Sequence, residues 1–140
     1  MSNFNIKAKN IIPYSITASI FIGIYIISRL FLKELYWFNW TSHSKYLYIW
    51  VVALILIHFE KYIISYSITF GNIGGIFLGQ FVGDAIKAKN MLKIEPGMDV
   101  EQIYHLQHHP GFEIWACSIL ACLAIGTIFY KLKTHIKNEK

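Results

Sequence analysis

Long apolar runs separated by short polar breaks set the pattern of this chain. The runs at residues 11–32 and 112–131 are each long enough to cross a bilayer core of about 30 Å, because a helix rises about 1.5 Å per residue. Between them lies one long apolar stretch with a polar break at residues 58–61, and two crossings of about 20 residues just fit it. We place these crossings at residues 44–60 and 62–85. The pattern therefore predicts an all-α integral membrane protein with four transmembrane helices.

The middle stretch allows a second interpretation. One long helix would run to about Phe70, break at residues 71–75, and continue as a re-entrant half-helix. Backbone that irregular is tolerated at membrane depth only inside protein or beside water. We favour four spans and keep the re-entrant version as the alternative.

The connection between the last two spans carries signals for a short helix. Residues 95–97 (Glu-Pro-Gly) form a turn signal, and Asp99 can cap a helix with Gln102 as its capping-box partner. Pro110 disfavours helical backbone in the residue before it, so we expect an extramembrane helix over about residues 100–109. This is too little chain for a soluble domain, and residues 1–140 are therefore expected to form a single polytopic membrane domain.

Small residues recur every fourth position through the third predicted span. The stripe consists of Ser67, Gly71, Gly75, Gly79 and Gly83. Glycine weakens a helix in water by about 0.5–1 kcal/mol relative to alanine, but in a bilayer small residues let two helix backbones approach closely. We therefore expect the four glycines to be helix-packing residues, between helices of this chain or between copies of it. Shorter stripes of the same spacing lie on the first span (Ser15, Ser19, Gly23) and on the fourth (Ser118, Cys122, Gly126).

The composition agrees with a membrane location. The chain is 55% hydrophobic and 15% charged, with a mean hydropathy of +0.43, whereas soluble domains carry about 25% charged residues. Aromatic residues cluster between residues 37 and 50, where we expect them at the level of the lipid headgroups. The bias toward Ile and Lys is typical of an AT-rich bacterial genome, and it indicates a bacterial inner (plasma) membrane.

The net charge of +5 comes from basic residues placed at the ends of the apolar runs. That placement fits contact with anionic lipid headgroups, and we expect the lipid bilayer rather than nucleic acid as the partner. With four spans, seven lysines lie on the side of the two termini and five on the other side, with Arg29 near that boundary. The excess favours a multi-pass protein with both termini in the cytoplasm.

The third predicted span also has a polar face. It is made of Ser65, Thr69, Asn72, Gln80 and Asp84, and Glu60 lies at the polar break before it. One interpretation is a path that binds or passes a small solute or ion; the other is hydrogen bonding between helices. A carboxylate in hydrocarbon costs about 2.5 kcal/mol or more, so Asp84 and Glu60 are expected at span ends, beside Lys87 and Lys61. In the re-entrant version both would sit deeper, as candidates for proton or cation coupling.

A group of histidines lies in the predicted extramembrane helix. His105 shares a helical face with His108 and with Glu101, and imidazole and carboxylate at these spacings can bind Zn²⁺ or iron. We therefore take Glu101, His105 and His108 as the ligand set if a metal binds, with His109 or Glu113 in support. The alternatives are a polar helix at the membrane surface and a group of histidines that senses pH.

The sequence His105-Leu106-Gln107-His108-His109 resembles one histidine box of the membrane fatty-acid desaturases and hydroxylases. The resemblance covers five residues of 140. Members of that family hold two irons with several such boxes, whereas this chain has only His43, His58 and His135 besides. We therefore do not carry the activity over.

Three functions remain open from the sequence. The first is a small oligomeric membrane protein that binds or passes a solute or ion along the polar face of the third span. The second is an accessory or immunity-type subunit that docks a larger membrane partner through its glycine stripe. The third is a metal-dependent membrane enzyme that uses the cluster at residues 105–109. We favour a role that is not enzymatic, and transport over the other two.

Overall fold

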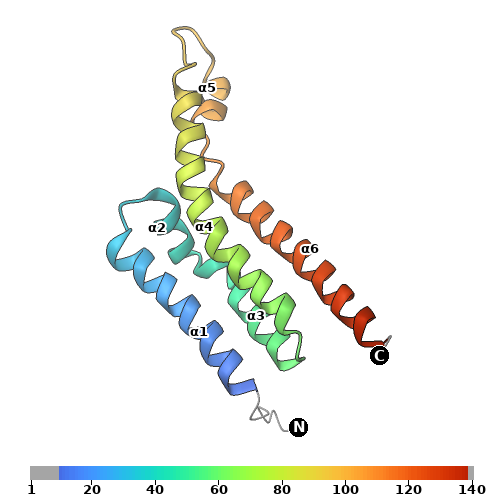
Figure 1. Ribbon diagram of the computed structural model, residues 1–140. Coiled ribbons are helices and arrows are strands. Elements are labelled where there is room, and N and C mark those ends of the chain that lie inside the picture. Colours follow the sequence, from blue (N-terminus) through green and yellow to red (C-terminus); the bar gives the residue numbers. More distant parts are fainter. Residues whose placement is uncertain (1–9, 139–140) are drawn as a thin grey trace, which may run out of the picture.

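The structure, a computed structural model, describes residues 10–138, and within that range the chain forms helices and no strand (Figure 1). In chain order the elements are α1 (Ile11–Ile26), the π-helical turn η2 (Ile27–Phe31), α2 (Tyr36–His43), the 3₁₀ turn η3 (Lys45–Tyr48), α3 (Ile49–His58), α4 (Tyr62–Met91), α5 (Val100–Gln107) and α6 (Gly111–Asn138). The predicted all-α class is thus confirmed.

Three helices of the described range are long and apolar enough to cross a membrane. They cover Ile11–Phe31, Tyr62–Met91 and Gly111–His135, with 21, 30 and 25 residues. The first, third and fourth predicted spans fall on these helices. The third begins at Tyr62, where the sequence places it, and extends six residues past the predicted end at residue 85.

The predicted second span, residues 44–60, is wrong as a crossing helix. Its only α-helical part is α3, which has 10 residues and rises about 15 Å, half of a bilayer core. The cause is the backbone before α3, where Lys45, Leu47 and Tyr48 have φ of 49°, 47° and 61°. Such left-handed conformations end a right-handed helix and are uncommon outside glycine. The chain therefore returns from α1 to α4 in three short pieces, α2, η3 and α3 (Figure 1).

The re-entrant alternative is also wrong, because α4 runs unbroken through residues 71–75. The short extramembrane helix exists as α5. Its N-cap is Asp99, as expected, and the Asp99 carboxylate accepts a hydrogen bond from the backbone N–H of Glu101 at 2.6 Å. The helix ends at Gln107, two residues before the predicted end, because His108 turns to an extended ψ of 135°.

The glycine stripe of α4 lies against α6, which runs antiparallel to it (Figure 1). A Cβ atom added at Gly71 would lie 2.9 Å from the Cα of Ile119, and one at Gly75 would lie 3.0 Å from the carbonyl oxygen of Trp115. Distances this short leave no room for any side chain. Gly71 and Gly75 therefore let the two helices pack backbone to backbone, whereas Gly79 is covered mainly by the Trp37 side chain and Gly83 by the His109 ring.

The other two small-residue stripes behave differently from each other. On α6, Cys122 lies beside Gly71, and Gly126 lies beside Ser67, so that stripe faces α4. On α1, Ser15 and Ser19 are exposed, and nothing lies within 4 Å of a Cβ placed at Gly23. Among residues 10–138, no helix therefore packs closely on the first stripe.

The helices α1, α2 and α3 pack on the other side of α4 from α6, and α1 begins at the end of the bundle where α6 finishes (Figure 1). Asn10 holds this end together, because its side-chain amide donates to the carbonyl of Ile57 at 3.4 Å and its oxygen accepts from the Tyr62 hydroxyl. The start of α1, the end of α3 and the start of α4 are thereby joined.

Candidate functional site

The segment made of α2, η3 and α3, which we call the broken segment, is attached to α4 at the N-terminus of α2. The first backbone N–H groups of a helix have no partner inside it, and the N-cap of α2, Leu35, offers no side-chain hydrogen bond. Gln80 of α4 supplies the acceptor instead. Its Oε1 accepts from the backbone N–H of Trp37 at 2.7 Å and from that of Phe38 at 3.4 Å. A buried side chain of α4 therefore caps α2 from outside the helix.

The same glutamine continues into a chain of polar contacts. Its Nε2 donates to Oδ2 of Asp84, one turn further along α4, and Oδ1 of Asp84 lies 3.2 Å from Nε2 of His109. The His109 side chain is 4% exposed, whereas the Asp84 side chain is 51% exposed. We call Gln80, Asp84 and His109 the polar latch, since they join α2, α4 and the segment before α6.

The hydrogen bonds fix the tautomer of His109. The backbone N–H of Gly111 donates to Nδ1 of His109 at 3.1 Å, so Nδ1 is the accepting nitrogen. The proton of the neutral ring is then on Nε2, where it is donated to the Asp84 carboxylate. Both ring nitrogens are therefore occupied by protein groups, and the histidine holds helices together rather than facing a substrate.

Aromatic rings enclose the latch. The His109 ring lies 4.8 Å from that of Tyr36 and 6.4 Å from that of Trp37, centroid to centroid, and Trp37 stacks on Trp40 at 4.7 Å. Trp37 is 2% exposed. Trp37 is part of the core because α2 folds back against α4, and the placement of these aromatic residues at the level of the lipid headgroups stays a prediction.

Four of the six predicted solute-path residues, Ser65, Thr69, Asn72 and Gln80, are buried inside the helix bundle, whereas Asp84 is exposed. Ser65 donates to the carbonyl of Ala53 on α3, Thr69 donates back to the carbonyl of Ser65, and Asn72 Oδ1 accepts from Trp115 Nε1 on α6. Together with Gln80, all of them are at most 1% exposed. The Ser65 and Asn72 contacts are the interhelical hydrogen bonds of the second interpretation, whereas the Thr69 hydroxyl bonds within α4. Passage of a solute along this face stays a prediction.

Glu60 lies apart from the rest of the predicted path. It occupies the turn between α3 and α4, with φ of 60°, at the opposite end of α4 from Asp84. Their separation of 24 positions along the chain corresponds to about 36 Å of helix. The structure therefore does not bring the two carboxylates together.

The predicted metal ligands do not converge. His105 and Glu101 are both exposed and 3.9 Å apart, whereas Nε2 of His108 lies 2.8 Å from Oε1 of Glu113 at the start of α6. The separation arises because α5 ends before His108. Among residues 10–138, no group of three or more His, Cys, Asp or Glu side chains is arranged to hold a metal ion.

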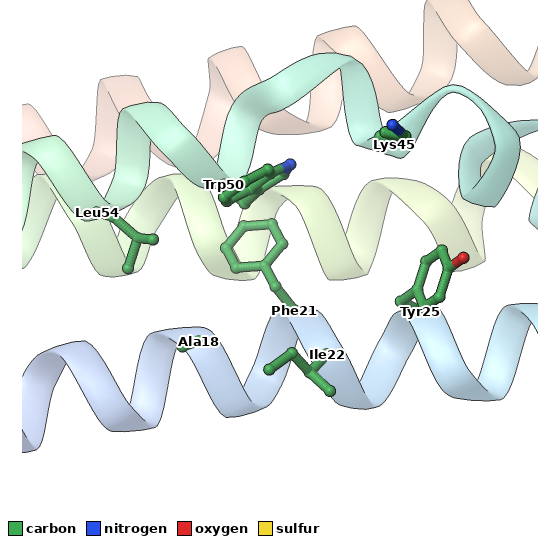
Figure 2. A pocket seen from close by; sticks show the side chains of 7 residues that line it. All are labelled: Ala18, Phe21, Ile22, Tyr25, Lys45, Trp50 and Leu54. Atoms are coloured by element: carbon green, nitrogen blue, oxygen red, sulfur yellow. The ribbon is translucent and has the colours of Figure 1, made fainter.

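A groove of about 350 Å³ opens between α1 and α3 (Figure 2). Its lining residues are Ala18, Phe21, Ile22, Tyr25, Lys45, Trp50 and Leu54. Phe21 and Trp50 lie next to each other in its middle, with Ala18 and Leu54 toward one end (Figure 2). Nearly all of the lining is apolar, so the groove suits a hydrocarbon chain.

The opposite end of the groove is polar and positively charged. Tyr25 and Lys45 lie there (Figure 2), and Lys45 is the single charged residue among the seven that line the groove. Arg29 adds a second cation, with its guanidinium carbon 6.0 Å from the centre of the Tyr25 ring and its Nη1 2.7 Å from Nε2 of His43. The groove is therefore amphipathic along its length.

Comparison of the chain with protein-family models, with curated proteins and with solved structures gives no match. The geometry of the candidate sites is therefore the evidence for what they could bind.

Sequence reasoning missed His109 as a latch residue and missed the groove entirely. The sequence offered one signal for the latch, since Gln80 and Asp84 are one helical turn apart and are both polar within an apolar span. It offered none for the groove. The lining comes from two segments about 30 residues apart, brought together by a turn whose left-handed residues are not glycines.

Proposed function

We propose that this protein is an integral membrane protein that binds a membrane lipid, with the acyl chain lying in the groove between α1 and α3. The observation that carries the proposal is the groove itself. It is apolar over most of its length and lies between helices, one of which is long and apolar enough to span the bilayer. A hydrocarbon chain reaches such a site sideways from the surrounding lipid, without passing through water.

The polar latch supports this proposal because it positions the groove. Gln80 holds the first turn of α2, and α2 leads directly into η3, which carries Lys45, and then into α3, which carries Trp50 and Leu54. Loss of the latch would free the whole segment that forms one wall of the groove. The buried polar groups of α4 then serve binding by holding the site open.

The test is retention of a lipid by the purified protein. Native mass spectrometry of the protein in mild detergent should find one phospholipid bound to the native chain. Ala18→Phe would fill the groove and should abolish retention. Ala124→Phe, the same enlargement on the exposed side of α6, should leave it unchanged. Equal retention by both variants would refute the groove as the binding site.

We also propose the orientation expected from the lysines. The broken segment of α2, η3 and α3 would make the return crossing, so that both termini lie in the cytoplasm and α5 lies outside the bacterial inner membrane. A cysteine placed at Asn90 should then react with an impermeant thiol reagent in intact cells, whereas one at Lys133 should not. The reverse labelling pattern would mean that the protein has the opposite orientation, with both termini outside the cytoplasm.

Binding of a small polar solute on the buried face of α4 is a second candidate. Two observations favour it: Nδ2 of Asn72 and Nε1 of Trp37 are buried donors with no hydrogen-bond partner within the described part of the chain. An unpaired buried donor costs about 1–3 kcal/mol, which a ligand acceptor would recover. A solute that raises the melting temperature of the native protein, but not of Asn72→Leu, would support this candidate over the lipid.

Association of copies, or with a larger partner, is proposed through α6 rather than through the glycine stripe. The glycines of α4 are covered by α6 and by the segment before it, whereas Cys117, Leu120 and Ala121 are exposed on the outer side of α6. Oxidative cross-linking of the native Cys117 in membranes should give dimers that disappear in Cys117→Ala. Dimers that persist in that variant would place the contact elsewhere.

A further inference from the structure

We infer that the lipid of the groove is an anionic phospholipid, whose phosphate is bound by Lys45 with Arg29 beside it. This inference rests on the proposed function, since it names the class of lipid that the same groove would select. A hydrocarbon chain alone gives the protein little preference for one lipid over another, because on binding the chain moves from one apolar environment, the bilayer, to another, the groove. Selection must come from the polar end.

The charge at that end is unbalanced within the groove. Lys45 is the charged lining residue, and it lies at the same end as the Tyr25 hydroxyl (Figure 2). Lys33, which precedes α2, has the carboxylate of Glu34 at 3.9 Å. Lys45 is thus placed to meet a phosphate, and the Tyr25 hydroxyl can donate to one of its oxygens.

Arg29 extends the same positive end. It is one turn beyond Tyr25 on the continuous helix formed by α1 and η2, and its neighbours are the Tyr25 ring and the His43 ring, which are not anions. A guanidinium that has no carboxylate partner among these contacts is suited to a phosphate oxygen. An anionic headgroup would therefore meet two cations and a hydroxyl.

The backbone holds Lys45 in this position at a cost. Its φ of 49° is left-handed, and Leu47 and Tyr48 share that conformation. Each such residue is less stable than in an ordinary helix, and strain of this kind persists only where the surroundings impose it. A straight helix through residues 44–60 would remove the strain, and it would also move Lys45 from the end of the groove.

The experiment measures occupancy and preference separately. The native protein is stripped of lipid, reloaded from vesicles of equal phosphatidylglycerol and phosphatidylcholine of matched chains, and analysed by native mass spectrometry. One lysine near an anionic headgroup corresponds to about a fivefold preference for the anionic lipid. Lys45→Gln should remove most of that preference, Lys45→Arg should keep it, and the control Lys33→Gln should leave it unchanged.

The two proposals fail in different ways. One bound lipid per chain without a preference, or with a preference that survives Lys45→Gln, overturns the anionic headgroup and leaves the groove intact. No retained lipid, or only detergent or free fatty acid, overturns both. Circular dichroism of Lys45→Gln and Lys45→Arg checks that the pair is equally helical, so that a lost preference reports charge.

Discussion

The α4–α6 pair and the α1–α3 pair pack in opposite ways. Between α4 and α6 the contact is made by backbone, because Gly71 and Gly75 leave no space for a Cβ atom. Between α1 and α3 it is made by large rings, with Phe21 and Trp50 in the middle and about 350 Å³ left open. The α4–α6 pair, which we call the closed pair, is packed tightly at these glycines, whereas the α1–α3 pair, the open pair, leaves a groove. The comparison indicates that the closed pair supports the fold and that the open pair is free to bind.

The largest loss of stability is expected when a side chain is added where α4 and α6 pack backbone to backbone. Gly75→Leu should destabilise the protein by about 3 kcal/mol or more, because its Cβ would already lie 3.0 Å from the carbonyl oxygen and 3.1 Å from the Cα of Trp115. Gly74→Leu is the matched control. Nothing lies within 4 Å of its Cβ, so it should be neutral or stabilising. Thermal unfolding in detergent, followed by circular dichroism, would compare them, and equal melting temperatures would contradict the closed packing.

The next effect concerns the latch between the two pairs. Gln80→Leu should cost about 1–3 kcal/mol, because it leaves the backbone N–H groups of Trp37 and Phe38 without their acceptor. It should also increase the solvent access of Trp37, seen as stronger quenching of tryptophan fluorescence by acrylamide. Thr127→Val, which loses a hydroxyl bonded within its own helix, is the control. Similar quenching in both variants would mean that α2 does not depend on Gln80.

A smaller difference is expected within the closed pair. A Cβ at Gly71 would meet three residues of α6, with the Cα of Ile119 at 2.9 Å, the Cβ of Cys122 at 3.0 Å and the carbonyl oxygen of Ser118 at 3.3 Å. A Cβ at Gly126 would be crowded by one side chain only, that of Ser67, through its Oγ and, at 2.8 Å, its Cβ. Gly71→Ala should therefore be less stable than Gly126→Ala by about 1 kcal/mol in the same melting experiment. If the order is reversed, backbone contact does not decide the tolerance of this interface.

The smallest change in stability should come from a substitution in the groove between α1 and α3. Ala18→Phe adds more volume than Gly71→Ala, yet the groove has room for the ring, so stability should stay within about 0.5 kcal/mol of the native protein. Its melting temperature, measured beside that of Gly71→Ala, tests whether the open space is tolerant. A loss as large as that of Gly71→Ala would mean that the groove is closed in the bilayer.

The sequence predicted the helical class and the three long helices because apolar runs of that length are a direct signal. It also predicted the end of α3 near residues 58–61, where Glu60 takes a left-handed φ. It failed at residues 44–60 because the hydropathy continues while the backbone breaks at Lys45, Leu47 and Tyr48, and these residues carry no turn signal. Hydropathy measures which side chains tolerate lipid, and does not measure backbone dihedrals.

In the candidate sites, too, some features could be predicted from the sequence and others could not. Gln80 and Asp84 were identified from a polar face within one helix, which a sequence displays directly. Their actual partners, the N–H of Trp37 and the ring of His109, come from segments 43 and 25 residues away. The metal prediction relied on helical spacing through His108, and it lost its basis when α5 ended at Gln107. Contacts within one helix were predictable, and contacts between segments were not.

The packing of α4 against α6 has a consequence for how the chain can be divided. The two helices meet from Ser67 beside Gly126 to Gly79 beside Gly111, so these contacts do not involve the turn at residues 92–99. Gly97, in the connection between the two helices, has φ of 98° and nothing within 4 Å of an added Cβ, as in an open turn. A chain cut at Gly97 would still present the two matching surfaces. We therefore expect the two fragments to reassemble in one membrane when they are produced from separate genes.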